Sequence, residues 1–152
     1  FKGTNTDVSF ITSSPIFSVE PALVQLSLEA MPNSNHYNLI YQEQSVKHSL
    51  VLNIDHQAQW QHEIILLSNI ADFNISYFGW QSFEQAIKQL NSDTLVKKEL
   101  PVWYQNHESD INRLLPDAIQ VSFINEKGLS DFKIALSQHS IYRLLSYTRV
   151  SE

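Results

Sequence analysis

Apolar and polar residues alternate along much of the chain, and this alternation predicts strands with one buried face. In the clearest stretch, Val24, Leu26 and Leu28 alternate with Gln25 and Ser27. The stretches that show the pattern are residues 7–12, 23–30, 37–42, 49–54, 71–79 and 118–124. Several short strands separated by turn-forming residues are typical of antiparallel β proteins.

Two pairs of these strands are predicted to form hairpins. Residues 31–35 contain Pro, Asn and Ser, which favour a turn between the strands at 23–30 and 37–42. Residues 125–128 read Asn-Glu-Lys-Gly and form the second predicted turn, directly after the strand at 118–124. The returning strand of this second hairpin is marked by Phe132, Ile134 and Leu136.

One stretch has helical spacing instead. Residues 80–90 are predicted to form a short helix, because their apolar residues lie three or four positions apart. Those residues are Trp80, Phe83, Ile87 and Leu90. Periodicity does not distinguish helix from strand for residues 60–68 or for residues 141–150. The apolar pattern is lost over residues 91–115, which are predicted to be mostly loop.

Length and composition indicate a single globular domain. The chain has 152 residues, of which 43% are hydrophobic and 17% are charged, and a chain of this size can bury a substantial core. We therefore predict one mostly β domain that spans residues 1–152. No stretch approaches the roughly 20 apolar residues that cross a bilayer. Because the chain starts at Phe1 and not at Met, we expect further sequence upstream.

Charge and cysteine content exclude several classes of function. The formal net charge is −6 and the pI is about 5.4, whereas nucleic-acid binding draws most of its affinity from basic patches. The same charge argues against attachment to a membrane surface through a basic amphipathic helix. The absence of cysteine excludes disulfides, cysteine-ligated zinc and thiol catalysis.

No familiar catalytic or metal-binding motif is present. His56, His62 and Glu63 are close in sequence, but their spacing fits neither the helical nor the strand arrangement of a metal site. The acidic segment around Asp110 lacks the spacing of a calcium loop. With three glycines, the chain has neither a nucleophile elbow nor a phosphate-binding loop. We therefore predict no catalytic, cofactor-binding or metal-binding residues, and no enzymatic activity.

The three tryptophans, Trp60, Trp80 and Trp103, mark the middle of the chain. One interpretation is a surface that binds sugar or peptide, since aromatic rings are frequent in such surfaces. The favoured interpretation is that they anchor the hydrophobic core, together with Phe10.

Several short motifs follow one another in a definite order. They are Phe1-Lys2-Gly3 before a strand that contains Phe10, Leu66-Leu67 before a strand that contains Tyr77, then Trp80, Trp103 and Leu115-Pro116-Asp117-Ala118. This order resembles that of the J-type minor pseudopilins of type II secretion systems, over residues 1–136. The matching residues are Gly3, Phe10, Tyr77, Trp80, Trp103, Leu115 and Pro116.

The resemblance implies an α+β, pilin-like fold. Two antiparallel sheets would form an incomplete barrel packed on an N-terminal helix, which is mostly truncated here, and residues 82–90 would be a short inserted helix between Trp80 and Trp103. The resemblance also implies a structural role without cofactors, as the periplasmic domain of a protein anchored in the bacterial inner membrane by that helix. Its partners would be the I-type and K-type minor pseudopilins at the tip of the pseudopilus, with secreted cargo as a further contact.

Two other functions stay open at this point. A minor pilin or adhesin of a type IV pilus would share much of the pattern and would act as a binding module. A periplasmic enzyme of an unfamiliar type is the third hypothesis, and no motif in the sequence supports it.

Overall fold

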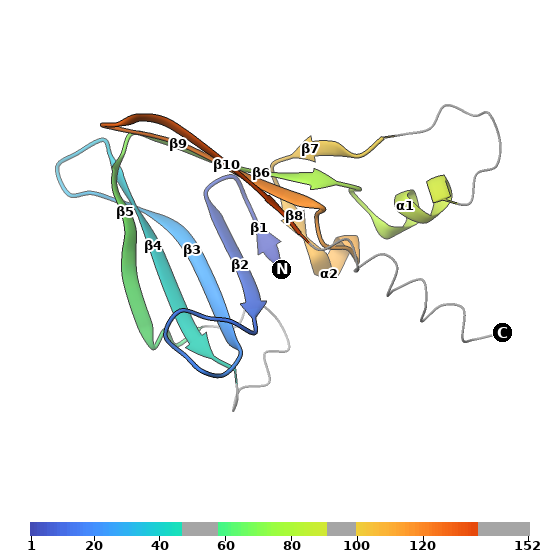
Figure 1. Ribbon diagram of the computed structural model, residues 1–152, viewed down its shortest axis with the longest axis horizontal. Coiled ribbons are helices and arrows are strands. Elements are labelled where there is room, and N and C mark those ends of the chain that lie inside the picture. Colours follow the sequence, from blue (N-terminus) through green and yellow to red (C-terminus); the bar gives the residue numbers. More distant parts are fainter. Residues whose placement is uncertain (47–57, 91–99, 137–152) are drawn as a thin grey trace.

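The protein is built mainly of antiparallel β-sheet. A computed structural model describes residues 1–46, 58–90 and 100–136, and these residues form two antiparallel sheets and two short helices (Figure 1). Neither sheet closes into a barrel. The strand predicted at 49–54 and the ambiguous segment at 141–150 lie outside the described residues.

The first sheet contains six strands in the order β5-β4-β3-β2-β1-β8. Most of it is a meander of neighbours in sequence, because β2 pairs with β3, β3 with β4, and β4 with β5. The strands are β1 (Lys2–Gly3), β2 (Asp7–Thr12), β3 (Ala22–Ala30), β4 (Tyr37–Ser45), β5 (His62–Ile70) and β8 (His107–Glu108).

The second sheet contains four strands in the order β10-β9-β6-β7. Its centre is the long pairing of β6 with β9, and the hairpin of β9 and β10 extends it to one edge. The strands are β6 (Asp72–Gly79), β7 (Val102–Tyr104), β9 (Ala118–Asn125) and β10 (Gly128–Ala135).

Most strand predictions are confirmed within a residue or two, and both predicted hairpins form. Most of the ambiguous residues 60–68 belong to strand β5, which begins at His62. The prediction of mostly loop over residues 91–115 is wrong for part of its described portion. This portion contains β7, β8 and the short helix α2 (Ser109–Asn112). These elements are too short for periodicity to reveal.

The predicted helix is present as α1 (Phe83–Leu90). It begins at Phe83 and not at Trp80 because Ser82 caps it: the Ser82 hydroxyl accepts a hydrogen bond from the Gln85 N–H at 3.2 Å. Ala86, on its inner side, is fully buried. Neither α1 nor α2 is the N-terminal helix implied by the resemblance. No helix within residues 1–46, 58–90 and 100–136 is long and apolar enough to span a membrane.

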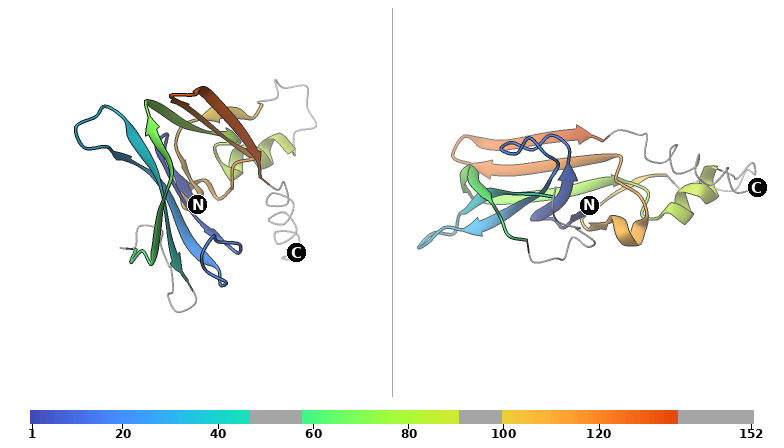
Figure 2. Two further views of the ribbon diagram at one scale, coloured as in Figure 1. Left: turned by 60° about the vertical axis from the view of Figure 1, so that its left-hand side comes forward. Right: turned by 90° about the horizontal axis from the view of Figure 1, so that it is seen from below.

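The two sheets share one hydrophobic core. The chain passes from β5 directly into β6 at Ala71, whose N–H donates to the Ile124 carbonyl at 2.8 Å and so ties this corner to β9. From this corner the sheets lie face to face and then open apart (Figure 2). The buried cluster between them consists of Val8, Leu39, Ile70, Phe73, Ile75, Tyr77 and Phe123.

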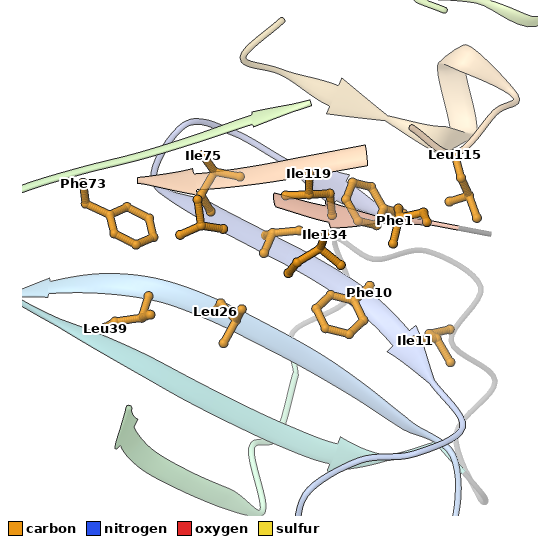
Figure 3. Close-up of a pocket in the computed structure, with 13 residues that line it drawn as sticks. Phe1, Phe10, Ile11, Leu26, Leu39, Phe73, Ile75, Leu115, Ile119 and Ile134 are labelled. Carbon is orange, nitrogen blue, oxygen red and sulfur yellow. The ribbon is translucent and has the colours of Figure 1, made fainter. Parts of the chain in front are cut away.

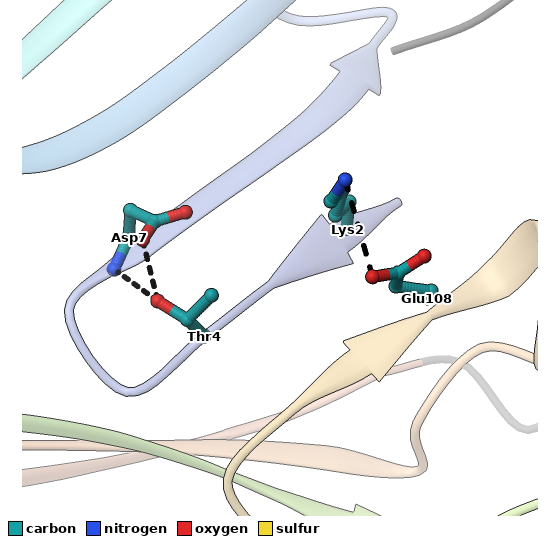
Figure 4. Close-up of polar contacts among 4 residues, drawn as sticks. All are labelled: Lys2, Thr4, Asp7 and Glu108. Atoms are coloured by element: carbon teal, nitrogen blue, oxygen red, sulfur yellow. Dashed lines mark hydrogen bonds and ion pairs between the residues drawn. The ribbon is translucent and has the colours of Figure 1, made fainter. Parts of the chain in front are cut away.

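The N-terminal strand is held in the first sheet by short pairings on both sides. Strand β1 lies between β2 and β8, and an ion pair of 3.9 Å joins Lys2 Nζ to Glu108 Oε1 (Figure 4). In the turn from β1 to β2, the Thr4 hydroxyl donates to the Asp7 carboxylate and accepts from the Asp7 N–H. Ser109, directly after β8, donates its N–H to the Phe1 carbonyl at 2.9 Å and so positions Phe1 beside the groove described next.

Candidate functional site

An apolar groove of about 520 Å³ lies between the two sheets. All the side chains that line it are hydrophobic, and they come from both sheets and from Phe1 (Figure 3). The first sheet contributes Val8, Phe10, Leu26 and Leu39, among others. The alternation of β2, β3, β9 and β10 explains most of the arrangement, because every second residue of each strand faces the opposite sheet. Ile11, next to Phe10 near the end of β2, is the exception.

One end of the groove is open to solvent. Ile11 is 52% exposed, Ile134 51% and Leu115 41%, although all three line it. Large apolar side chains left half exposed around a hollow are typical of a site that binds an apolar surface. The side chains that line the groove offer no donor, acceptor or charge, so the groove is suited to an apolar helix or chain.

Two of the residues matched by the resemblance, Gly3 and Tyr77, are in direct contact. The Tyr77 ring is fully buried beneath β1, and its hydroxyl donates to the Thr4 carbonyl at 2.8 Å. A Cβ atom at position 3 would overlap this hydroxyl, so only glycine leaves room for it. Burial raises the pKa of Tyr77 well above its usual range, with the nearby Asp7 charge adding to the effect.

Beside Tyr77 lies His107, a buried residue that the sequence analysis did not single out. Its Nε2 lies 2.8 Å from the Leu114 carbonyl, which can only accept, so Nε2 carries the proton. Nδ1 then accepts from the Tyr104 hydroxyl at 2.9 Å. Burial lowers the pKa of His107, while burial and the charge of Asp117 raise the pKa of Tyr104 to about 12.

This cluster supports the wall of the groove. The Phe1 ring packs edge-on against both Tyr77 and His107, with ring centroids 5.8 and 5.5 Å apart. His107 is fully buried and both its ring nitrogens are occupied, so it is unsuited to acid–base catalysis. We interpret the cluster as the support that positions Phe1.

Four of the five remaining matched residues lie in or near the groove or at the end of β6. Phe10 is half-buried and lines the groove, and Leu115 lies at its open end. Pro116 is fully buried behind Leu115. Trp80 is half-buried at the end of β6. Phe10 therefore packs against the core, as predicted, while part of it faces the groove.

For Trp103 the prediction of a core anchor is wrong. Its side chain is 41% exposed and packs on the outer face of the second sheet against Phe78, with ring centroids 5.2 Å apart. The Lys133 ammonium lies 5.3 Å from the Trp103 ring and 5.7 Å from the Phe78 ring. Leu115 is likewise too exposed to be a core residue. Trp60 is half-buried.

A second feature missed by the sequence analysis is the buried carboxylate of Glu43. It accepts hydrogen bonds from three consecutive backbone N–H groups, those of Ile16, Phe17 and Ser18, at 2.9, 3.1 and 2.7 Å. The Tyr41 hydroxyl donates a fourth at 2.6 Å. Burial by itself would raise the pKa of Glu43, but these hydrogen bonds outweigh it and hold the pKa at about 2.

The Glu43 network fixes the loop between β2 and β3. This loop crosses the end of the first sheet that the second sheet does not cover (Figure 1), and Phe17 stacks on His62 of β5 at 5.0 Å between ring centroids. A signal for Glu43 existed in the sequence. It follows Leu39 and Tyr41 on the alternating face of β4 that turns inward.

No group of three or more His, Asp or Glu side chains that could hold a metal lies within the described parts of the chain. His62 is exposed and stacked on Phe17. His56, its proposed neighbour in sequence, lies outside the described residues.

Comparisons with known proteins identify no relative: no family model matches the chain, and neither curated proteins nor solved structures give a significant match.

Proposed function

We propose that the chain is the periplasmic domain of a J-type minor pseudopilin of a type II secretion system, with a structural and not an enzymatic role. The main support for this proposal is the apolar groove, which Phe1 helps to line. In the resembling family a hydrophobic N-terminal helix packs on two antiparallel sheets. A helix that led into Phe1 would reach this protein at the groove, and its apolar side chains would cover the exposed lining.

The contact between Gly3 and Tyr77 gives further support. These residues belong to two separate motifs of the resemblance, and they meet in one buried cluster. Each motif then has a physical role, because the first places Phe1 and the second supplies the ring on which Phe1 rests.

In this role the domain would assemble with the I-type and K-type minor pseudopilins at the tip of a short periplasmic filament. Such contacts are head-to-tail and use different patches on each partner. They would pass near the open end of the groove, where apolar side chains are already exposed. Secreted cargo would be a further contact of the tip.

The upstream part of the gene gives the first test. A prepilin gene encodes a short basic leader, followed by a hydrophobic segment that carries Glu five residues after the cleavage site. We expect this arrangement ahead of Phe1. A signal peptide without it, or an unrelated upstream domain, would remove the proposal. Neighbouring genes for type IV pilus assembly would instead favour the minor pilin.

Binding gives the second test. The purified domain should bind the soluble domain of the I-type minor pseudopilin from the same operon in analytical ultracentrifugation. Leu115→Asp, at the open end of the groove, should weaken binding by roughly tenfold or more, because it places a charge in an apolar contact. Ile111→Asp changes a residue that is 72% exposed on α2 and serves as the control. Wild-type protein that binds no pseudopilin would contradict the proposal.

A further inference from the structure

Strand β10 is the one long and regular sheet edge within the described residues. At the other edges, β7 has three residues, β8 has two, and the pairing of β5 with β4 is interrupted by register shifts. Strand β10 has eight residues and pairs with β9 without a break from Gly128 to Ala135. Proteins usually protect such edges with proline, bulges, short length or charged side chains. Strand β10 has no proline and no bulge, and of these devices it carries only the two charges of Asp131 and Lys133.

The pairing with β9 determines which backbone groups face the open edge. Leu136 donates its N–H to the Asp117 carbonyl at 2.8 Å, in register with the β9–β10 ladder. Alternate residues of an antiparallel strand turn their N–H and C=O to opposite sides. The even-numbered residues of β10 therefore turn toward β9, and Leu129, Asp131, Lys133 and Ala135 turn toward the edge.

The side chains of β10 are also exposed to an unusual degree. Phe132 and Ile134 face the groove side, since they pair with Val121 and Ile119, yet they are 56% and 51% exposed. Leu129, on the other face, is 72% exposed. Among the described residues nothing pairs with the outer side of β10, and a strand of this kind with apolar side chains on both faces is suited to pair with another strand.

We propose that β10 pairs antiparallel with β10 of a second copy of this chain, about a two-fold axis at Phe132. In this register Asp131 lies opposite the partner's Lys133, and Lys133 opposite the partner's Asp131. Both opposite-charge pairs lie on the face away from the groove. On the groove side Phe132 meets the partner's Phe132, and the two second sheets become one continuous sheet.

The charges select this register over its neighbours. Only odd-numbered residues turn their N–H and C=O groups toward the edge, so each of them must lie opposite an odd-numbered residue of the partner. The allowed registers therefore place the two-fold axis at successive residues of β10. Moving the axis to Asp131 places two aspartates opposite each other, and moving it to Lys133 places two lysines opposite each other. Like charges directly opposite are destabilising, whereas opposite charges stabilise a cross-strand pair.

Contacts within each copy are compatible with the pairing. The Asp131 carboxylate accepts from Gln120 Nε2 at 2.9 and 3.0 Å and from the Ser122 hydroxyl at 3.2 Å, which holds it on the outer face. The Lys133 ammonium lies on the same face, over the Phe78 and Trp103 rings of β6 and β7, which is the side away from the edge. Its flexible side chain therefore has to turn toward the edge to meet the partner's Asp131. The net charge of −6 repels two copies, so moderate salt should strengthen the dimer by screening that repulsion.

Charge-exchange variants test the pairing. Sedimentation velocity of the 152-residue chain should show a concentration-dependent dimer. Asp131→Lys and Lys133→Asp should each weaken it by roughly tenfold or more, because each replaces two opposite-charge pairs by two like-charge pairs. The double variant D131K/K133D restores opposite charges and should recover most of the affinity. Glu126→Lys, in the β9–β10 turn, makes the same charge change away from the pairing and is the control.

A cross-linking experiment tests the axis itself. Residues that face each other without hydrogen bonds lie about 4.5 Å apart between Cα atoms, a distance that suits a disulfide. Phe132→Cys should therefore form a disulfide-linked dimer under mild oxidation, and Ser130→Cys should form little, because its opposite residue is the partner's Ile134. The chain contains no other cysteine, so any cross-link reports on the new one.

Three outcomes would overturn the proposal: a chain that stays monomeric up to about 1 mM, a double variant that stays as weak as the single ones while keeping its circular dichroism spectrum, or equal cross-linking at positions 130 and 132. The proposal is independent of the pseudopilin assignment. Binding to an I-type domain and pairing of β10 are measured separately, and either can fail without the other.

Discussion

At the scale of single residues, Glu43 shows how a buried charge can organise a loop. An isolated carboxylate in a protein interior is costly, but here four donors surround it. The loop in turn gains a fixed course. Its own sequence does not explain that course, because Ser13, Ser14 and Pro15 are followed by exposed apolar residues. The carboxylate and the loop are therefore mutually dependent.

Glu43 should make the stability of the protein depend on acid. Its pKa is about 2 in the folded protein, below the usual value of 4.5. The stabilisation is thus fully present above about pH 5, and it is lost as the pH falls toward 2, because the unfolded chain takes up the proton first. Glu43→Gln should lower the free energy of unfolding by about 2 kcal/mol at pH 7. It should also make that free energy depend less steeply on pH between pH 5 and 2.

Denaturant unfolding followed across this pH range measures the effect. Glu63→Gln is the matched control, since Glu63 is exposed and only accepts from Gln42, and its loss should change little. An E43Q protein with the acid dependence of the wild type would show that other carboxylates cause it.

At the scale of elements, the strands of the second sheet differ in how well the first sheet covers them. Ile75 of β6 and Ile134 of β10 both line the groove. Ile75, in the centre of the sheet, is 1% exposed, whereas Ile134, at the edge, is 51% exposed. The same side chain on the same face therefore contributes differently according to the position of its strand.

Truncation of these two residues should separate their contributions. Ile75→Ala should cost about 2–5 kcal/mol, because it leaves a cavity in the packed core. Ile134→Ala should cost less than about 1 kcal/mol, since solvent already reaches the side chain. Chemical denaturation at one fixed, low protein concentration compares them without a contribution from self-association. Equal losses would mean that something covers β10 in solution.

The elements that sequence could predict are those with a regular pattern over at least six residues. Strands β2, β3, β4, β6, β9 and β10 and the helix α1 have it. Strand β5 does not, because its apolar residues Ile64–Leu67 are consecutive and neither their polarity nor their burial alternates. Its pairing with β4 identifies it as a strand. Strands β7 and β8 are too short to show a pattern and are identified as strands by their pairing with β6 and β1. A pattern along the chain does not reveal such a pairing.

At the scale of the whole molecule, the alternation of residues indicated an antiparallel β protein and the resemblance implied two sheets, but neither indicated which strands belong to which sheet. The division depends on Ala71, where the chain leaves one sheet for the other. The turn-forming residues Ser68 and Asn69 precede this point, and Asn69 has a φ of 59°, but they do not distinguish a turn within one sheet from a change of sheet. The groove was equally hidden. Phe10 and Leu115 are distant in sequence. They line the same groove because β2 and the segment before β9 form parts of its walls. His107 was missed because a buried histidine looks like any other in sequence.

The pairing of β1 with β8 has a consequence for how the protein is made. The meander from β2 to β5 joins neighbours along the chain and can form as it leaves the ribosome. Strand β1 precedes the other strands and can pair with β2 early, but its second pairing, of Lys2 with Glu108, must wait until most of the domain has been translated. We expect pulsed hydrogen exchange during refolding to protect β3 and β4 before β1, and simultaneous protection would contradict this order. The wall at Phe1 is thus finished late, and a nascent chain meets its quality-control machinery with the groove still incomplete.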